Sequence, residues 1–262
     1  MSILALDIGN SRFKWGLFDG TDIAGLRSGG ACTLEEIEAV AAPAFSLLSR
    51  PQRIIGCVVA GEVAKRRVSG LMQHWATLGS KPQWIVSQRE QCGVKNSYHY
   101  PWLLGADRWA ALIGARTRVP DAPVLVVSVG TAVTIDSLDE SGLFLGGLIL
   151  PGFGLMLRAL EMGTAGLRVP SGEVVDFPRN TSDALMTGGA HAIAGAVERS
   201  YRQLTQHAGR QPRLLVSGGA AVKLSPSLDL PHEHVEHLVF EGLLRIAATT
   251  AAPVPAPPVV IK

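Results

Sequence analysis

The feature that most constrains the fold of this sequence is a pattern that occurs twice. An apolar strand runs into a turn of small residues, and a second strand with alternating polarity follows. In the first copy the turn is Asp-Ile-Gly-Asn-Ser at residues 7–11, and in the second it is Ser-Val-Gly-Thr at residues 128–131. A turn with glycine and a further strand complete each copy. This repetition predicts two related halves, and two such turns facing each other across a cleft could hold one polyphosphate.

The first turn has the chemistry of a phosphate site. Glycine lets the backbone approach a ligand closely, and Asn and Ser side chains and backbone N–H groups can bind phosphate oxygens. Asp7, at the end of the strand, could hold Mg²⁺ through water, and Lys14 adds a positive charge suited to a polyphosphate. An ordinary surface hairpin uses the same residue types, so this segment alone leaves both interpretations open.

Composition excludes several classes of protein. The 262 residues are 47% hydrophobic and 18% charged, which fits a packed globular protein with room for two modest domains. A net charge of +2 without a dense basic run argues against a nucleic-acid partner. No apolar run is long enough to span a membrane, because glycine, proline or a charged residue interrupts each one. The sequence also shows no signal-peptide pattern. We therefore expect a cytoplasmic protein without a membrane partner, with its three separated cysteines reduced.

The remaining elements follow an α/β order. After the first two strands we expect a helix that starts with a capping box at residues 33–36, and Pro43 should kink or end it. The longest helix should have Thr181 or Ser182 as its N-cap. The other expected elements are strands at 54–60, 84–86, 124–127, 132–138, 143–150 and 214–216, and helices at 62–78, 153–162 and 182–207.

The catalytic candidate lies at the start of another helix. Gly105 opens this helix, and Asp107 and Arg108 occupy its first turn. A carboxylate there is often only a partner of the helix dipole. Here the adjacent arginine and the aromatic residues just upstream could clamp a small anionic substrate. Asp107 could then accept the proton of a substrate hydroxyl during phosphoryl transfer.

The histidines do not form a zinc pattern. His99 has no partner at ligand spacing, so we interpret it as structural. His232, His234 and His237 lie close together with two glutamates, but their spacing fits no common zinc site and favours an exposed polar loop and strand edge.

Five segments in order resemble the motifs of type III pantothenate kinases, over nearly the whole chain except its tail. Residues 7–15 are similar to the first phosphate motif, and residues 105–109 to the Gly-x-Asp-Arg motif. Residues 130–136 resemble the second phosphate motif, and residues 147–160 the glycine-rich stretch that follows the third strand. The pair Asn-Thr at 180–181 resembles the family's Asn-Thr before a long helix.

The resemblance implies the fold shared by acetate and sugar kinases, heat-shock chaperone ATPases and actin. Two duplicated actin-like, ribonuclease H-like α/β domains would flank a nucleotide cleft, at residues 1–118 and 119–251, with a proline-rich tail at 252–262. It also implies transfer of the γ-phosphate of ATP to the 4′-hydroxyl of pantothenate, the first step of coenzyme A biosynthesis. Family members are homodimers with part of the pantothenate pocket at the dimer interface.

The resemblance also assigns roles to individual residues. Asp107 would be the general base. The residues implied to bind pantothenate are Tyr100, Gly105, Ala106, Asp107, Arg108 and Thr181. Those implied to bind ATP are Asp7, Ile8, Gly9, Asn10, Ser11, Arg12, Phe13, Lys14 and Thr131, with Gly218 and Gly219 expected at the adenine. Asp7 is the expected ligand of Mg²⁺.

The sequence departs from the family pattern at Ser128, where many members carry an aspartate that binds a monovalent cation. A hydroxyl is a much weaker cation ligand than a carboxylate. Dependence on K⁺ or NH₄⁺ is therefore expected to be altered or absent, with Asp136 as a candidate substitute.

Two other functions remain open from the sequence. Some members of the resembling family are described as accessory factors for transcription, and another small alcohol could be the acceptor on the same fold. The presence of Asp7, Asp107, Arg108 and Thr131 argues against a catalytically dead kinase.

Overall fold

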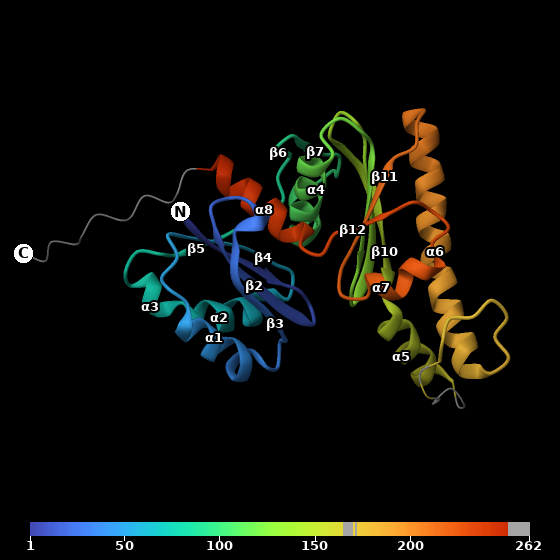
Figure 1. Ribbon diagram of the computed structural model, residues 1–262, viewed down its shortest axis with the longest axis horizontal. Helices are drawn as coiled ribbons and strands as arrows, with labels where there is room; N and C mark the ends of the chain where they lie inside the picture. The colour runs from blue at the N-terminus through green and yellow to red at the C-terminus, as the bar shows by residue number, and fades with distance from the viewer. Residues whose placement is uncertain (165–169, 171, 251–262) are drawn as a thin grey trace, which may run out of the picture. The chain divides into compact units, whose positions relative to one another are not determined.

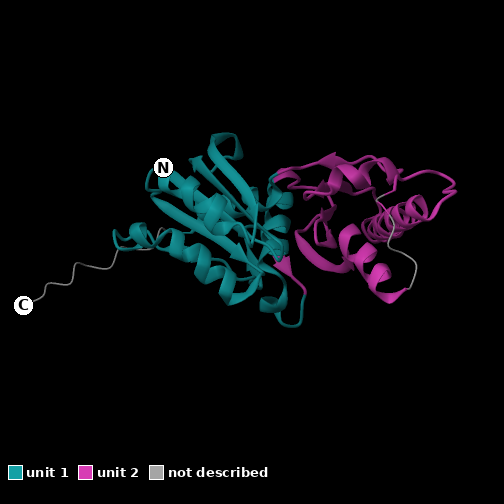
Figure 2. Cartoon of the chain, turned by 90° about the horizontal axis from the view of Figure 1, so that it is seen from below, with its two compact units in different colours: residues 1–94, 98–117, 237–262 teal, residues 95–97, 118–236 magenta. Residues whose placement is uncertain are grey.

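The computed structural model describes residues 1–164, 170 and 172–250, so the proline-rich tail expected at 252–262 lies outside the described residues. The chain forms two compact units (Figure 2). Unit 1 comprises Met1–Val94, Tyr98–Thr117 and the C-terminal segment from His237, and unit 2 comprises Lys95–Ser97 and Arg118–Glu236.

Unit 1 is built on a five-stranded sheet with the order β3-β2-β1-β4-β5 (Figure 1). Strands β1, β2 and β3 are antiparallel neighbours, whereas β4 and β5 run parallel to β1. The strands are β1 (Ser2–Ile8), β2 (Arg12–Asp19), β3 (Leu26–Thr33), β4 (Arg53–Val58) and β5 (Pro82–Trp84).

Unit 2 repeats this order and these directions in β10-β9-β8-β11-β12. These strands are β8 (Val124–Val129), β9 (Ala132–Leu138), β10 (Leu143–Pro151), β11 (Arg213–Ser217) and β12 (Glu233–His234). Beyond β10 the sheet continues with β7 (Val94–Asn96) and β6 (Glu90–Gln91). The shared topology confirms the two related halves predicted from the repeated strand–turn–strand pattern, and with them the duplicated α/β fold.

Helices connect the strands in both halves. In the first half they are a single π-helical turn (Ile37–Ala41), α1 (Ala42–Leu47), α2 (Gly61–Leu71), α3 (Gln73–Ala76) and α4 (Ala106–Arg118), with short 3₁₀ turns at Ile23–Gly25 and Pro101–Leu103. In the second half they are α5 (Phe153–Gly163), α6 (Thr181–Ala208), α7 (Ala221–Leu224), a 3₁₀ turn at Ser225–Ser227, and α8 (Leu238–Thr249).

Strand β3 is the further strand that the sequence analysis expected to complete the first copy of the repeat, without assigning its residues. Most of its side chains are exposed, and it contains Gly29 and Gly30, so it lacks the apolar alternation of a half-buried strand. Gly30 is needed for packing, because a Cβ there would overlap the indole ring of Trp15 on β2. Gly30 therefore makes room for a neighbouring strand's side chain rather than forming a turn.

Several helix ends differ from the expectation. The carboxylate of Glu36 accepts hydrogen bonds from the backbone N–H and the hydroxyl of Thr33, both at 2.9 Å. Pro43 lies in the first turn of α1, which directly follows the π turn. The helix expected at 62–78 is broken into α2 and α3 at Met72. The prediction of Thr181 or Ser182 as the N-cap of α6 was wrong, because the side chain of Asn180 accepts from the Asp183 N–H at 2.9 Å.

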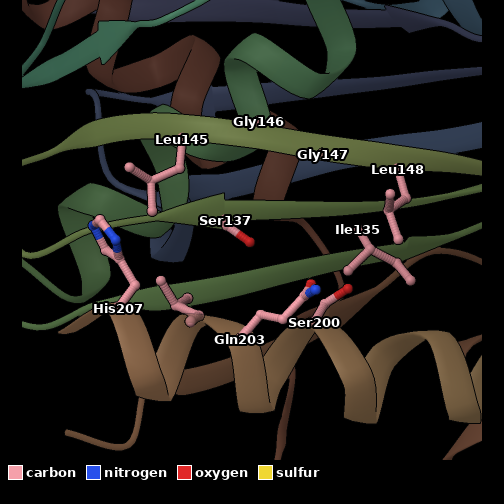
Figure 3. A pocket seen from close by; sticks show the side chains of 10 residues that line it. Ile135, Ser137, Leu145, Gly146, Gly147, Leu148, Ser200, Gln203 and His207 are labelled. Carbon is pink, nitrogen blue, oxygen red and sulfur yellow. The ribbon is translucent and has the colours of Figure 1, made fainter. Parts of the chain in front are cut away.

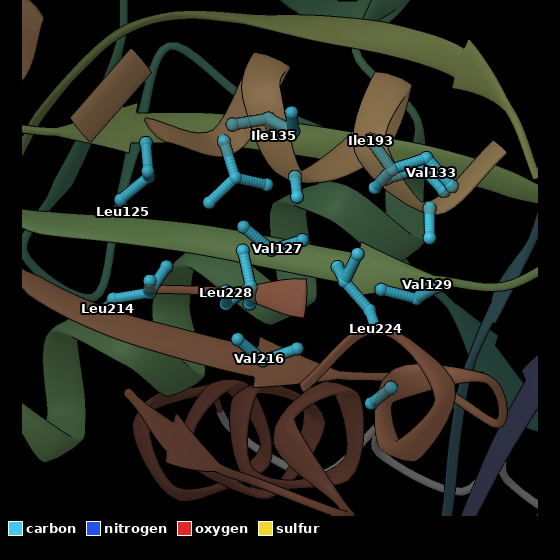
Figure 4. Close-up of a cluster of buried hydrophobic side chains, with 14 of the residues drawn as sticks. Leu125, Val127, Val129, Val133, Ile135, Ile193, Leu214, Val216, Leu224 and Leu228 are labelled. Carbon is cyan, nitrogen blue, oxygen red and sulfur yellow. The ribbon is translucent and has the colours of Figure 1, made fainter. Parts of the chain in front are cut away.

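Each unit has its own hydrophobic core. In unit 1 an aromatic group of Phe13, Trp15, Phe45 and Trp75 lies beneath β1 and β2, with ring centroids 5.2–6.0 Å apart. In unit 2 the inward-facing side chains of β8, β9 and β11 pack against α6 and α7 (Figure 4).

Helix α8 packs in unit 1, although the sequence analysis placed residues up to 251 in a C-terminal domain. It crosses α4 at two glycines. A Cβ on Gly242 would overlap the carbonyl group of Ala110, and a Cβ on Gly114 would overlap the carbonyl oxygen of Leu238. The guanidinium of Arg53 on β4 also donates to the carbonyl oxygens of Ala247 and Thr250 at the end of α8. These contacts join α8 to the first half of the chain.

Candidate active site

The first phosphate turn connects β1 to β2. The N–H of Gly9 donates to the carbonyl oxygen of Arg12 at 2.9 Å, which closes the turn and leaves Asn10 and Ser11 exposed. Ile8 and Phe13 on either side are fully buried in the core. The core thus fixes the two ends of the turn, and Ile8 and Phe13 can contribute only backbone groups to a bound nucleotide.

Asp7 lies just before this turn and is only 9% exposed. It pairs in register with Lys14 on β2 and with Cys57 on β4, and the Cys57 thiol donates to its Oδ1 at 3.4 Å. Burial raises the pKa of Asp7 from 3.8 to about 6, and the positive charge of Lys14 opposes this rise. The charge of Asp107 raises the pKa of Asp7 further, so the fold has brought these two carboxylates within electrostatic reach of each other.

Asp107 lies in the first turn of α4, where the sequence analysis placed it. Its Oδ1 accepts the backbone N–H of Arg108 at 2.8 Å. Burial raises the pKa of Asp107, and the Arg108 N–H and charge oppose this rise. A Cβ on Gly105 would lie 2.6 Å from the Asp107 Oδ1, so glycine is required for this carboxylate to fold back over the start of the helix.

The side chain of Arg108 is held by Tyr98. The Nη1 of Arg108 donates to the Tyr98 hydroxyl at 3.2 Å, and its Cζ lies 5.9 Å from the centroid of the Tyr98 ring. The neighbouring Trp109 is fully buried and donates from Nε1 to the Oε1 of Gln91 at 2.9 Å. Tyr98 and Gln91 were missed as site residues. Tyr98 lies in the aromatic segment noted upstream of α4, whereas nothing in the sequence around Gln91 indicates its partner.

Tyr100, which the resemblance implies to bind pantothenate, is 57% exposed. Its ring lies 5.4 Å from that of Trp102, which is also exposed. These two rings form an aromatic surface two to four residues after Tyr98 along the chain, in unit 1 with Asp107 and Arg108.

The second phosphate turn occupies the equivalent place in unit 2, between β8 and β9. The N–H of Gly130 donates to the carbonyl oxygen of Ala132 at 3.0 Å, and Thr131 is exposed. The N–H of Gly152 donates to the Thr131 carbonyl at 2.9 Å, and a Cβ on Gly152 would overlap the carbonyl oxygen of Gly130. The glycine-rich stretch after β10 therefore packs directly on this turn.

Hydroxyl groups surround Ser128, the residue at which this sequence departs from the family pattern. Ser128 at the end of β8 pairs with Thr134 on β9 and with Ser217 on β11. The Oγ1 of Thr134 is buried and has no hydrogen-bond partner among the described residues. Asp136 is fully buried. It lies two residues after Thr134 on β9 and pairs with Val126 on β8, two residues before Ser128.

The remaining predicted residues also lie in unit 2. Gly218 has a φ of +99°, and a Cβ there would overlap the backbone of Val129, so its glycine is required for packing against β8. Gly219 borders open space. Thr181 is the first residue of α6 and is exposed.

A pocket of about 320 Å³ lies elsewhere in unit 2, between β9, β10 and the second half of α6 (Figure 3). It contains none of the predicted site residues. Its lining has no charged side chain, which does not fit a polyphosphate or a carboxylate substrate; the lining residues are Ile135, Ser137, Leu145, Gly146, Gly147, Leu148, Ser200, Gln203, Leu204 and His207.

The histidine cluster near β12 has structural partners. The ring nitrogens of His232 contact the Leu230 carbonyl oxygen at 2.8 Å and the Ser225 hydroxyl at 3.1 Å. Glu233 pairs with Arg118 and Arg213. Within residues 1–164, 170 and 172–250, no group of three or more His, Cys, Asp or Glu side chains is arranged to hold a metal ion. The helices of this described part include none with the length and apolarity needed to span a membrane.

Comparison with known proteins identifies the family. A type III pantothenate kinase family model matches residues 3–203. A type III pantothenate kinase from Acidovorax ebreus is 53% identical over 261 residues, covering 98% of this chain and all of the relative. Another from Leptothrix cholodnii is also 53% identical, covering 96% of this chain and 98% of the relative.

The chain belongs to the type III pantothenate kinase family. The resemblance inferred from the five motifs is therefore confirmed, and the protein is a kinase. The two relatives align with nearly the whole of this chain. The similarity therefore covers both halves of the duplicated fold.

More distant solved structures share the overall fold of this chain. A Campylobacter jejuni protein described as a Baf family transcriptional activator has a TM-score of 0.58 at 22% identity, covering 94% of this chain and 97% of the other. A Listeria monocytogenes protein described as an N-acetylmannosamine kinase has a TM-score of 0.51 at 13% identity, covering 95% and 98%. At these identities the likeness shows the fold alone.

Proposed function

We propose that this chain transfers the γ-phosphate of ATP to the 4′-hydroxyl of pantothenate, the first step of coenzyme A biosynthesis. The observation that carries this proposal is the placement of Asp107 in unit 1. Its carboxylate is partly buried at the start of α4, within electrostatic reach of Asp7 at the first phosphate turn, in a member of the type III pantothenate kinase family. A base and a phosphate-binding turn in one unit are what phosphoryl transfer to an alcohol requires.

Asp107 acts as the general base. Burial raises its pKa, which makes the carboxylate a stronger base than a free aspartate. Arg108 binds the carboxylate of the acceptor, because a guanidinium can form two parallel hydrogen bonds with it. Tyr100, with its exposed ring, and Thr181 contribute further to the acceptor site.

The two glycine turns bind the phosphates of ATP. Asn10, Ser11 and the backbone N–H groups at residues 9–12 serve one side, Thr131 serves the other, and Lys14 adds a positive charge. Gly219, beside open space, is the better candidate for contact with the adenine, because Gly218 is needed for packing.

The residues present fit a Mg²⁺ ion that is shared with the nucleotide. Asp7 is a carboxylate at the phosphate turn whose ionised form is disfavoured by burial, and a divalent cation would stabilise that form. Mg²⁺ commonly uses one or two carboxylates together with substrate phosphates. When bound, it would neutralise charge on the transferring phosphoryl group.

The residues around Ser128 do not fit the monovalent cation of the family. Ser128, Thr134 and Ser217 supply hydroxyls, and the nearest acidic residue of this strand face, Asp136, lies one alternate position deeper. We therefore propose that turnover does not require K⁺ or NH₄⁺. Ser128→Asp would test this, because restoring the carboxylate should make the rate respond to these cations.

We also propose that the protein is a homodimer, as the resemblance implies, with ATP and pantothenate as its small-molecule partners. Unit 2 exposes large apolar side chains, including Ile149 on β10 and Met162 on α5, that a second copy could cover. Sedimentation of the purified protein measures its mass directly.

The decisive experiment is ATP- and Mg²⁺-dependent phosphorylation of pantothenate by the purified protein, in Na⁺ buffer alone and with K⁺ or NH₄⁺ added. If product forms in Na⁺ buffer at the same rate as with K⁺, the result supports both the proposed pantothenate kinase activity and the proposal that turnover does not require K⁺ or NH₄⁺. Product only with K⁺ or NH₄⁺ contradicts the proposal for Ser128. No product under any salt, with a folded protein, would move the assignment to another acceptor or to the accessory role.

A further inference from the structure

Three polar side chains lie in one row across the sheet of unit 1, beside the first phosphate turn. Asp7 on β1 pairs in register with Lys14 on β2 and with Cys57 on β4. The residues that follow in the two parallel strands, Ile8 and Val58, pack in the aromatic core of this unit. Because successive side chains of a strand point to opposite faces of the sheet, the polar row lies on the face away from that core.

Cys57 contacts the carboxylate of Asp7 directly. The cysteine is fully buried, and its thiol donates to the Oδ1 of Asp7 at 3.4 Å. Burial raises the pKa of the Cys57 thiol well above its usual value, and the negative charges of Asp7 and Asp107 raise it further. The thiol therefore remains protonated at neutral pH and can serve as a hydrogen-bond donor. This contact engages Oδ1 and leaves Oδ2 to face a ligand.

The second half of the chain repeats this row with other residues. Strands β8, β9 and β11 of unit 2 correspond to β1, β2 and β4 of unit 1. Ser128 lies two residues before a turn glycine, as Asp7 does, and it pairs with Thr134 on β9 and with Ser217 on β11. Ser217 therefore occupies the position of Cys57. Both copies of the fold place a small hydrogen-bond donor here, and in unit 1 its neighbour is a carboxylate.

We infer that Cys57 is a positioning residue for the complex of Mg²⁺ with the nucleotide, because its thiol holds Oδ1 of Asp7 and so presents Oδ2 to the ion. A hydrogen bond to one oxygen fixes the orientation of a carboxylate before the ion arrives, which lowers the entropy cost of binding. Cys57 itself does not bind the ion, since Mg²⁺ prefers oxygen ligands. The inference rests on the proposed function, because it takes Asp7 as the carboxylate at the shared ion.

Cys57→Ala removes the donor, and Cys57→Ser restores one in a side chain of similar size. We expect the KM for ATP in the presence of Mg²⁺ to rise roughly three- to tenfold in Cys57→Ala, because a partner of a metal-binding carboxylate is lost and a thiol is a weak donor. In Cys57→Ser this KM should return to within about twofold of the wild-type value. The KM for pantothenate should be unchanged in both variants, since Arg108 is untouched.

Cys32→Ala is the matched control. Cys32 is also a buried thiol in the sheet of unit 1, but it lies on the edge strand β3, where it pairs with Phe13. Both alanine variants lose one buried sulfur, and urea unfolding measures what that loss costs in stability. The KM for ATP should rise in Cys57→Ala and stay at the wild-type value in Cys32→Ala. An equal rise in both variants would reveal a general effect of loosened packing and overturn the inference.

Calorimetry with a non-hydrolysable ATP analogue measures the same effect without turnover. With Mg²⁺ present, Cys57→Ala should bind the analogue roughly three- to tenfold more weakly than the wild type. In EDTA the two proteins should bind it equally, because Asp7 then has no ion to hold. A loss of the same size with and without Mg²⁺ would contradict the proposed role of Cys57.

A double-mutant cycle with Asp7→Asn tests whether Cys57 acts through this carboxylate. In the Asp7→Asn background, Cys57→Ala should cause no further loss of affinity for the analogue with Mg²⁺. The same loss in both backgrounds would mean that Cys57 acts by another route, and the inference would be wrong.

The outcomes also separate this inference from the proposed function. A wild type that neither binds the analogue with Mg²⁺ nor phosphorylates pantothenate removes the proposed function, and the inference falls with it. A wild type that turns over normally, with a Cys57→Ala variant of unchanged KM and affinity for the nucleotide, overturns the inference alone. A Cys57→Ser variant as impaired as Cys57→Ala also overturns it, because the restored donor should be enough to hold Asp7.

Discussion

Asp7 and Asp107 have environments that differ strongly from that of an ordinary surface aspartate. Both are charged groups held in a largely buried setting, and burial is the main cause of the raised pKa in each case. Asp107 lies at the start of a helix beside Arg108, whereas Asp7 lies at the first phosphate turn beside Lys14. These two environments fit the roles proposed above, of Asp107 as general base and of Asp7 at the nucleotide.

Asp107→Asn should abolish phosphoryl transfer. The amide cannot accept the proton of the acceptor hydroxyl, so kcat should fall by about two to four orders of magnitude. Nucleotide affinity should remain within a few-fold, because the phosphate turns are untouched. Steady-state kinetics and calorimetry with an ATP analogue measure the two effects, and equal turnover by the variant would remove Asp107 from the role of base.

Asp7→Asn should stabilise the nucleotide-free protein at neutral and higher pH. The folded pKa of about 6 exceeds 3.8, so wild-type stability is lost as pH rises through this window and the loss is complete above it. The shift of about two pKa units corresponds to roughly 3 kcal/mol of unfolding free energy. The neutral Asn variant avoids this loss and can still accept the Cys57 hydrogen bond.

Urea unfolding of wild type and Asp7→Asn at pH 4 and pH 8, without nucleotide or Mg²⁺, measures this difference. The gain should be large at pH 8 and small at pH 4. A gain that is the same at both pH values would mean that the carboxylate charge is not its cause.

At the scale of elements, glycines decide which segments can pack. Gly30 on β3 leaves room for the ring of Trp15 on β2, Gly152 lets the end of β10 pack on the second phosphate turn, and Gly242 lets α8 approach α4. In each case the partner is another segment's side chain or backbone, and a Cβ would overlap it. These are close approaches that no single segment of sequence reveals, because the overlapping atom comes from a distant residue.

Gly242→Ala should destabilise unit 1, because the added methyl group would overlap the Ala110 carbonyl in α4 and force the two helices apart. We expect a loss of about 1–3 kcal/mol in unfolding free energy. Gly188→Ala on α6 is the matched control, since a Cβ there meets no atom within 4 Å, and alanine favours a helix over glycine by roughly 1 kcal/mol.

Thermal and urea unfolding of the two variants test this contrast. Gly242→Ala should unfold at lower urea than the wild type and Gly188→Ala at equal or higher urea. Equal stability of both variants would show that α4 and α8 can separate without cost.

At the scale of the whole molecule, the predicted site residues belong to both units. Asp7, Asp107, Arg108 and Tyr100 belong to unit 1, whereas the second phosphate turn and Thr181 belong to unit 2. Both phosphate turns lie at the same topological position, between the first and second strands of equivalent five-stranded sheets. Duplication of one fold therefore supplies two turns of the same kind, one for each unit.

The proposed homodimer can be tested together with the acceptor site. If Thr181 completes the pocket of the other copy, Asp107→Asn and Thr181→Val chains will each be impaired, and a mixed dimer will contain one intact site. Thr181 is not the N-cap of α6, so its replacement should preserve the helix.

Co-expression with two different tags allows the mixed dimer to be purified and assayed. We expect it to recover a substantial share of the activity, up to about half that of the wild type, because one of its two sites is restored. Activity no higher than that of the Thr181→Val homodimer would show that Thr181 serves the site of its own chain.

The sequence by itself determined the local features and the family. The apolar runs predicted β1, β4, β8, β9, β10 and the long helix α6, because strand and helix periodicities are properties of neighbouring residues. The turns at residues 9–12 and 130–132 and the first turn of α4 were placed correctly for the same reason. The five motifs in order identified the kinase family, which the full-length relatives confirm.

Only the tertiary structure decided what depends on residues far apart in the chain. It placed the exposed strand β3 at the edge of the first sheet, packed α8 in unit 1 through Gly242, and set Asn180 as the cap of α6. It also buried Asp7 against Cys57, brought Asp107 within reach of its charge, and joined Tyr98 to Arg108. A pKa or an orientation is set by the atoms that surround a group, and folding alone brings those atoms together.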